Sequence, residues 1–417
     1  MRWRRSGGRL ARLVAVGSVL GPGLVAANAG NDAGGIATYA SVGARYGYDL
    51  LWMMVLITVS LVVVQEMAAR MGAVTGKGLA ELIREEFGPR WSLFSTVSVL
   101  LANLGICISE FVGIGAALGL AHVPPQASVP VAAVVVWLLV VRGSYTVANR
   151  VFVAMTIPFF AYPIAAVLAH PHWSAVGKAI VVPHVHLDAP YLLLFVATAG
   201  TTITPFMQLY LQSAVVERGL GPEDVPAERL EVASASLFAN LVASFIIIAT
   251  GATLFVHGHR TVSNAADAAR ALEPFAGRFA EVLFAIGLLG ASMLAAAILP
   301  VTAAYVISET FGLEKGIARR PREAPVFVGV ITVLIAIGAV VAVIPGVPVI
   351  KLLVLVQVVN GALLPVTLFF VWRLSRNREL MGDYRNGRVF DVLAAATVIA
   401  TSALSLLLLA VTLSGNA

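Results

Sequence analysis

The chain is poor in charge and has almost no cysteine. Only 12% of its 417 residues are Asp, Glu, Lys or Arg, about half the share in an average soluble domain, while 59% are hydrophobic and the mean hydropathy is +0.91. This composition excludes an ordinary water-soluble protein and predicts a polytopic membrane protein. The single cysteine, Cys107, excludes an intrachain disulfide and a thiolate metal cluster.

Several functional signals are also missing. The apolar runs contain no nucleophile–base pair and no metal-ligand triad, so we do not expect an enzyme. A net charge of +6 does not by itself predict nucleic-acid binding, because a basic surplus in a membrane protein usually comes from its cytoplasmic loops. We therefore expect no cofactor and no nucleic-acid partner, and membrane lipid as the surroundings of the chain.

Eleven apolar runs are long enough to cross a membrane as helices. They cover residues 10–46, 50–73, 92–120, 128–142, 148–169, 189–217, 231–256, 277–311, 326–344, 349–374 and 390–413. The sequence therefore predicts an all-α polytopic membrane protein of eleven helices, with residues 1–417 forming a single transmembrane domain. An odd number of spans places the two termini on opposite sides of the membrane.

The distribution of Lys and Arg predicts the orientation. With these spans, only six of the 28 basic residues lie on the side opposite the N-terminus, namely Arg45, Lys178, Arg260, Arg270, Arg278 and Lys351. Cytoplasmic loops carry the excess of basic residues, so we expect a cytoplasmic N-terminus and an external C-terminus. A bacterial plasma membrane is the expected location.

The N-terminus also has the pattern of a secretory signal, with a basic region, an apolar region and small residues at 26–29. Cleavage there would remove the half-helix that precedes Asp32. Because the rest of the chain is already multi-spanning, the membrane-helix interpretation is favoured.

One charged residue interrupts the first apolar run. Residues 28–35 contain two Asn, three Gly and Asp32, a poor composition for a continuous helix. A charge at membrane depth is costly and is usually functional, and unwound backbone survives there only where protein or water covers it. This stretch therefore predicts a polar site on a broken helix, with Asp32 at its centre.

A second interruption lies in the run at 189–217. Thr201, Thr202 and Thr204 cluster there, and Pro205 frees the carbonyl of Thr201 because it lacks the N–H that would bond to that carbonyl. A simple proline kink is the alternative interpretation.

The positions of the two interruptions favour a functional interpretation. The broken runs open two sets of five helices, at about 10–169 and 189–374, with an extra helix at 390–413. Broken helices at corresponding places in two halves indicate an inverted-repeat transporter with its site at the membrane midplane. A carboxylate with carbonyls and hydroxyls around it suits a cation.

With these features placed, the chain resembles the NRAMP family of divalent-metal transporters over nearly its whole length. The resemblance rests on GPGLVAANAGNDAGG, LLWMMVLITVSLVVVQEMAARMGAVTGKGLAEL, SEFVGIGAALGL, TPFMQLYLQSAVV, LFAIGLLGASMLAAAI and LVLVQVVNGALLPVTL. It implies the inverted-repeat fold first seen in sodium-coupled amino acid transporters and a divalent metal ion as the transported substrate.

The resemblance also implies a metal site. Its residues are the Asp32 carboxylate, the backbone carbonyls of Ala29 and Thr201, the Thr204 hydroxyl, Gly35 as a source of space, and the polar side chains Gln357 and Asn360. Gln357 stands where the family places a polar residue that faces the site, and Asn360 follows on nearly the same helix face, where it could bind an outer-shell water. For both side chains, helix packing is the alternative role.

Two family motifs are altered in this chain. The usual Asp-Pro-Gly-Asn of helix 1 is Asp32-Ala33-Gly34-Gly35, and the usual Met-Pro-His of helix 6 is Thr204-Pro205-Phe206. The segment after Pro205 is also one residue longer than in the family, with Met207-Gln208 before Leu209, which predicts a π-type bulge.

These replacements indicate which ion is carried. Thioethers prefer soft transition metals, whereas oxygen ligands suit Mg²⁺, Ca²⁺ and Mn²⁺. Loss of the thioether, the imidazole and the Asn amide leaves a roomier oxygen site, and Mg²⁺ is usually held through one or two carboxylates with several waters retained. The chain is thus similar to the NRAMP-related magnesium transporters, and we expect transport of Mg²⁺, with Mn²⁺ also carried.

Proton coupling is expected to be absent or weak. The resemblance places the family's proton route at a helix 6 His and at an Asp and a Glu of helix 3; here these positions are Phe206, Cys107 and Glu110. Glu110 is then either a remnant of coupling or a buried structural acid paired with a helix-end donor. We expect passive uptake by a monomeric functional unit.

Three other functions stay open. A proton-coupled Mn²⁺/Fe²⁺ importer of the ordinary family type would require a thioether or imidazole in the site. A non-transporting membrane sensor on the same fold would be expected to carry a large cytoplasmic output domain. A transporter of organic substrates is opposed by Asp32, which stands where an amino acid carrier receives the substrate carboxylate.

Overall fold

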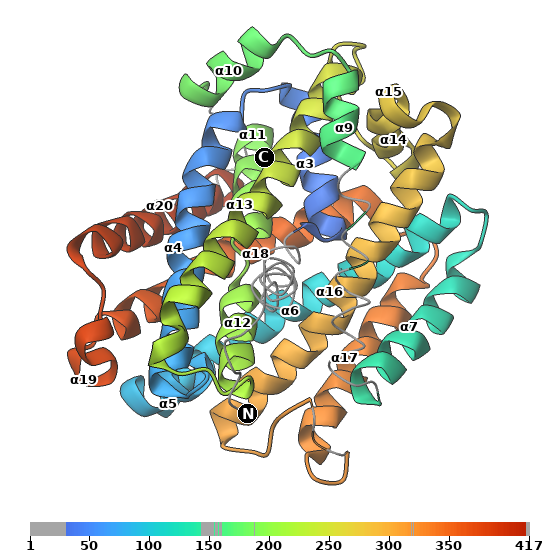
Figure 1. Cartoon of the computed structure of the whole chain (residues 1–417). Coiled ribbons are helices and arrows are strands. Elements are labelled where there is room, and N and C mark those ends of the chain that lie inside the picture. Colours follow the sequence, from blue (N-terminus) through green and yellow to red (C-terminus); the bar gives the residue numbers. More distant parts are fainter. Residues whose placement is uncertain are drawn as a thin grey trace, which may run out of the picture.

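The structure is a computed structural model that describes residues 31–142, 154, 157, 161–186, 188–317, 319 and 321–413. Every regular element in these ranges is helical (Figure 1). Eight of the helical segments are long and apolar enough to cross a membrane, and the apolar α7 is shorter. The predicted all-α membrane fold is therefore confirmed for the described part of the chain.

The main helices follow the predicted runs closely. They are α3 (Ala33–Tyr46), α4 (Leu51–Thr75), α5 (Leu79–Phe87), α6 (Pro89–Gly119), α7 (Pro125–Val141), α9 (Ala161–Leu168), α10 (Trp173–Val181), α11 (Ala189–Thr202), α12 (Pro205–Glu217), α13 (Val225–Thr250), α16 (Ala280–Phe311), α17 (Pro325–Ala342), α18 (Val349–Ser375) and α20 (Arg388–Leu413). Short helices α14 (Ala265–Ala269), α15 (Glu273–Ala276) and α19 (Arg378–Met381) lie in the connections.

Two predicted helices are only partly covered. The first half of the broken helix 1, with Ala29, lies outside the described residues, as does most of the run at 148–169, of which α9 is described. The predicted π-type bulge at Met207-Gln208 was wrong, because α12 is a regular α-helix there. Thr204 and Pro205 start a new helix, so an added residue only lengthens it. A π-helical turn is found instead at Gly251–Phe255, directly after α13.

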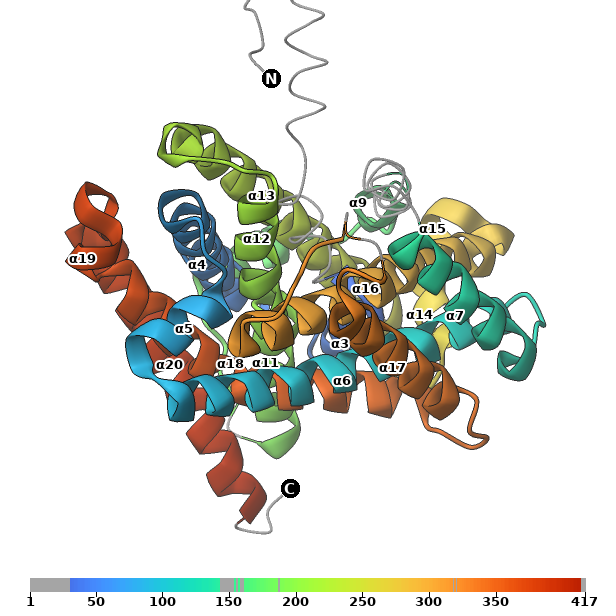
Figure 2. The same ribbon diagram turned by 90° about the horizontal axis from the view of Figure 1, so that it is seen from below.

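The helices pack into two groups. One apolar cluster consists of side chains of α6, α7, α16 and α17, which contact one another pairwise. A second and larger cluster includes α3, α4, α12 and α13, in which α4 contacts both α12 and α13 and α3 contacts α13. Figures 1 and 2 show α7 and α17 on one side of the molecule and α4 and α13 on the other. The half-helix α12 contacts α4 of one group and α16 of the other.

Glycines bring α11 and α18 into close contact. A Cβ atom added at Gly200 of α11 would collide with the backbone of Gln357 and Gly361 of α18, and one added at Gly361 would collide with the carbonyl of Val196. Small residues of this kind are the usual means by which membrane helices approach closely. The contact holds Gln357 and Asn360, both on α18, next to the C-terminal end of α11.

Candidate metal-ion site

Asp32 is the N-cap of α3. Its backbone is extended (φ −67°, ψ −178°), and its Oδ1 accepts a hydrogen bond from the backbone N–H of Gly35 at 2.6 Å. The side chain thereby satisfies one of the N–H groups that a helix leaves unpaired in its first turn, and its charge faces the positive end of the helix dipole. The charge that interrupts the apolar run is thus also the residue that starts the second half-helix.

Gln357 joins Asp32 to α18. The amide nitrogen Nε2 of Gln357 donates to Oδ1 and Oδ2 of Asp32 at 3.2 and 3.3 Å. A Cβ atom at Gly34 would collide with the Gln357 amide group, so glycine at this place is what allows the amide to reach the carboxylate. Asn360 Nδ2 continues the chain, donating to Gln357 Oε1 at 3.3 Å and to the carbonyl of Gly200 at 2.6 Å. These hydrogen bonds connect α3, α18 and α11.

Glu110 brings a second carboxylate to the start of α3. Its Oε2 accepts a hydrogen bond from the backbone N–H of Ala33 at 3.2 Å, and its Oε1 accepts one from Ser109 Oγ at 3.3 Å. Asp32 and Glu110 are both fully buried, and neither forms an ion pair with any described residue. Two buried acids without a basic partner are costly inside a membrane, which favours a cation or a proton at this place.

The break between α11 and α12 follows directly after the end of α11, which Asn360 and Tyr39 join to α18 and α3. Ile203 and Thr204 leave the helical conformation, and Pro205 begins α12 at a position where its missing N–H would be unpaired in any case. Thr201 and Thr204 are fully buried. The C-terminal end of α11 is the negative end of a helix dipole, so the last carbonyls of this half-helix favour a cation.

Several buried side-chain oxygen atoms of α4, of α18, and of α12 with its N-cap accept no hydrogen bond from a described residue. They are Thr204 Oγ1, Asn360 Oδ1, Gln65 Oε1 and Gln212 Oε1. Thr204, the N-cap of α12, is followed at every fourth residue by Gln208 and Gln212, so these polar side chains form a buried stripe along α12. The stripe runs from the break toward the loop after α4. There, Gln212 Nε2 donates to the carbonyl of Lys77 at 2.9 Å. The oxygens are suitable acceptors for water bound to an ion.

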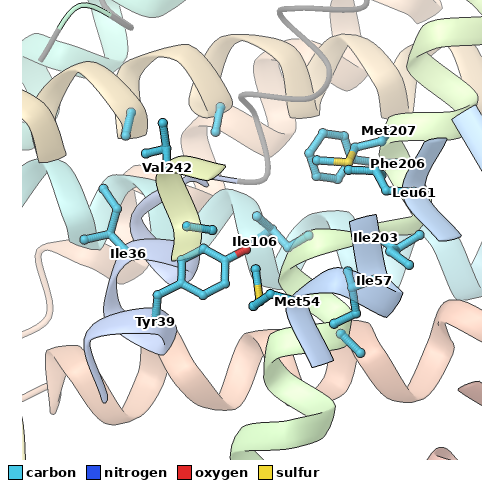
Figure 3. Packing of buried hydrophobic residues seen from close by; sticks show 14 of the residues in the cluster. Ile36, Tyr39, Met54, Ile57, Leu61, Ile106, Ile203, Phe206, Met207 and Val242 are labelled. Carbon is cyan, nitrogen blue, oxygen red and sulfur yellow. The ribbon is translucent and has the colours of Figure 1, made fainter. Parts of the chain in front are cut away.

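Phe206 and Cys107, the two replaced motif positions, have other surroundings, as does the neighbouring Met207. Phe206 is packed in the apolar core, and Figure 3 shows it with Met207 beside Leu61. The Met207 thioether accepts a hydrogen bond from Gln65 Nε2 at 3.6 Å. Cys107 Sγ lies 3.5 Å from the carbonyl of Leu334 on α17, so the thiol packs within the α6–α17 group.

A contact between Tyr39 and Thr202 was missed by sequence reasoning. The Tyr39 hydroxyl and Thr202 Oγ1 are 2.8 Å apart, which joins α3 to the last residue of α11. The available signal was spacing, because Tyr39 follows Asp32 by seven residues, or about two helical turns, and therefore lies on the same face of α3. The tyrosine packs with Ile36, Met54 and other apolar side chains in Figure 3.

The predicted site residues are thus brought together only in part. Asp32, Gly35, Gln357 and Asn360 are linked by direct hydrogen bonds, and Thr201 and Thr204 lie in the adjacent break. Ala29 lies outside the described residues. The donor atoms available are carboxylate, hydroxyl, amide and carbonyl oxygens, a set that suits a hard divalent cation.

A family model and the curated relatives of this chain point to the same family. The model of the family described as natural resistance-associated macrophage protein-like matches residues 23–411. The divalent metal cation transporter MntH of Ralstonia nicotianae is 33% identical over 399 residues, which covers 90% of this chain and 86% of the relative. The protein of the same name from Acidiphilium cryptum is 30% identical over 404 residues, with 93% and 89% covered.

Solved structures show the same fold. A manganese transporter of Eremococcus coleocola, in complex with an aromatic bis-isothiourea substituted compound, superimposes with a TM-score of 0.77 at 20% identity and covers 97% of this chain and 88% of its own. MhsT in complex with L-phenylalanine gives a TM-score of 0.60 at 13% identity, with 93% and 97% covered. At these identities the likeness establishes the fold alone, and it confirms the predicted amino acid transporter-like fold.

The capping role of Asp32 can be measured apart from its charge. Asp32→Asn and Asp32→Ala both remove the charge, but Asn keeps an oxygen that can accept from Gly35 N–H and from Gln357. We expect Asp32→Ala to be less stable than Asp32→Asn by about 0.5–2 kcal/mol, the usual value of an N-cap. Thermal unfolding of the two variants in the same detergent checks this, and equal melting temperatures would refute the capping role.

Proposed function

This chain belongs to the Nramp family, natural resistance-associated macrophage protein-like, and we propose that it is a divalent metal cation transporter. Its substrate is proposed to be Mg²⁺, with Mn²⁺ also carried, taken up passively by alternating access. In this proposal the chain is a single transporter domain with repeats at about 10–169 and 189–374, acts as a monomer, is not an enzyme, and has its N-terminus in the cytoplasm of a bacterial cell.

One observation carries the proposal. The carboxylate of Asp32 is held at a helix break by neutral donors only, and oxygens of Thr204 and Asn360 in the same region accept no hydrogen bond from a described residue. A divalent ion that entered would neutralise the buried charge of Asp32 and Glu110. Its retained waters would donate to the unpartnered oxygens, so the site supports an ion that keeps part of its hydration shell.

The choice of Mg²⁺ rests on the atoms that face the break. Thr204 offers a hydroxyl where the family usually has a thioether, and Gly35 offers only backbone where the family usually has an amide. The nearby Met207 thioether is directed to Gln65 of α4. Mg²⁺ gives up water reluctantly and binds through few carboxylates, so an oxygen site with a single direct carboxylate suits it better than it suits softer ions.

Passive transport is supported by the loss of acidic and imidazole side chains along the family's proton route. At the three positions of the family's route only Glu110 is a carboxylic acid, and it is engaged by the N–H of Ala33. Cys107 contacts a backbone carbonyl of α17 and does not continue a route from Glu110. A negative-inside potential contributes about 4.6 kcal/mol per 100 mV for a divalent ion, twice the value for one charge, so uptake does not require protons.

A proton-coupled manganese importer is the second candidate. It is favoured by the relatives, since the MntH proteins are named divalent metal cation transporters and the structurally similar Eremococcus coleocola protein is a manganese transporter. Glu110 would then be the group that carries the proton. The altered motifs at Gly35 and Thr204 are the observation that this candidate leaves unexplained.

A flux assay distinguishes the two candidates. Purified protein in liposomes is given external Mg²⁺ or Mn²⁺ under a potassium-diffusion potential, while internal Mg²⁺ and internal pH are recorded together. We expect Mg²⁺ entry that increases with the inside-negative potential and no acidification. Liposomes without protein are the control. Absence of Mg²⁺ entry, together with Mn²⁺ entry that acidifies the interior, would refute the proposal in favour of the proton-coupled importer.

The role of Thr204 in selectivity is tested by Thr204→Met. A thioether in place of the hydroxyl removes an oxygen and adds a soft ligand, so we expect the Mg²⁺ flux to fall relative to the Cd²⁺ flux by about tenfold, or about 1.4 kcal/mol. Thr253→Met, the same change at a half-buried threonine beyond α13, is the matched control and should leave the ratio unchanged. An unchanged ratio in Thr204→Met would remove Thr204 from the site.

A further inference from the structure

Half of the basic residues on the sparsely charged side of the molecule surround one pocket. A cavity of about 420 Å³ opens between the C-terminal end of α3, the first turns of α11 and α18, and the loop that follows the π-helical turn at Gly251–Phe255. Arg45, Arg260 and Lys351 all line it. Because the predicted spans place only six basic residues of the chain on this side, three around one pocket form a pronounced local concentration of positive charge.

These three charges have no acidic partner in the described part of the chain. No carboxylate of a described residue lies within 4.0 Å of their side-chain nitrogens, and all three residues are exposed. The Arg260 guanidinium is 3.5 Å from the centroid of the Phe255 ring, and that of Arg45 is 5.7 Å from the Tyr46 ring. These aromatic contacts position the two guanidinium groups but leave their charge uncompensated. The rim is therefore chemically suited to an anion.

The walls of the pocket are apolar. Leu194 of α11 and Leu355 and Val358 of α18 line it, and the distance along α18 from Lys351 to Val358 is about 10 Å at 1.5 Å per residue. Leu355 is 59% exposed, so this wall continues into the outer surface of a membrane-spanning helix. A small hydrophilic anion would leave the wall uncovered, whereas an amphipathic anion would fill both parts of the pocket.

We propose that this pocket binds an anionic phospholipid of the outer leaflet, with the phosphate between Arg45, Arg260 and Lys351 and one acyl chain along the wall formed by α11 and α18. Basic side chains at a helix end and an apolar groove below them match the two parts of such a lipid. The single negative charge of the bound phosphate would also offset part of the positive charge that otherwise repels a divalent cation approaching along α3. The choice of the outer leaflet rests on the proposed orientation of the chain, and this last consequence rests on the proposed transport function.

Native mass spectrometry of the delipidated full-length protein tests the binding directly. We expect dioleoyl phosphatidylglycerol to bind at least tenfold more tightly than dioleoyl phosphatidylcholine. Combined Arg45→Gln, Arg260→Gln and Lys351→Gln should remove this preference. The matched control, combined Lys178→Gln, Arg270→Gln and Arg278→Gln, removes the other three basic residues of the same side and should keep it. Equal binding of the two lipids, or an unchanged preference in the first variant, would overturn the proposal.

Two further arms make the outcome decisive. Excess inorganic phosphate should fail to displace the bound phosphatidylglycerol; displacement would assign the pocket to a soluble anion and overturn the lipid assignment. If the triple variant does not fold, Lys351→Glu alone changes an exposed side chain and should still lower phosphatidylglycerol occupancy, and unchanged occupancy would contradict the proposal. Because binding is measured without transport, failure of metal flux would refute the proposed function and leave this result intact.

Discussion

The hydrogen bond from Gly35 N–H to the Asp32 carboxylate is the interaction on which the site depends. A carboxylate buried in a membrane is costly, and here the first turn of α3 compensates it with a backbone donor and the positive end of a helix dipole. Gln357 adds a neutral donor from α18. The compensation is incomplete, because no basic side chain among the described residues neutralises Asp32 or Glu110, and this is the basis on which we propose a cation site here.

Helix packing fixes the geometry around that charge. Gly34 admits the Gln357 amide, and Gly200 with Gly361 lets α11 and α18 approach until Asn360 reaches the carbonyl of Gly200. The end of α11, the start of α3 and the middle of α18 are thereby held together by a continuous set of hydrogen bonds. A divalent ion entering this region would find the oxygen atoms of these described residues already oriented.

Much of this arrangement could be predicted from the chain itself. Asp32, the surrounding glycines and the Thr-Pro interruption predict two broken helices, because charge, Gly and Pro are each unfavourable in a continuous apolar helix. Contacts between helices were not predictable in this way. The Tyr39–Thr202 pair, the collision that only Gly34 avoids, and the engagement of Glu110 by Ala33 N–H all depend on how distant segments pack. The expected bulge at Met207-Gln208 failed for a local reason, since Pro205 starts a new helix that absorbs the extra residue.

We propose two separable roles for Asp32, as the cap of α3 and as the ligand of the ion. Calorimetric titration of the purified protein with Mg²⁺, comparing the wild type with Asp32→Asn, tests this most directly. The variant keeps the capping oxygen and loses the charge, so we expect saturable Mg²⁺ binding in the wild type and none in a variant that still melts cooperatively. Mg²⁺ binding of unchanged affinity in Asp32→Asn would contradict it.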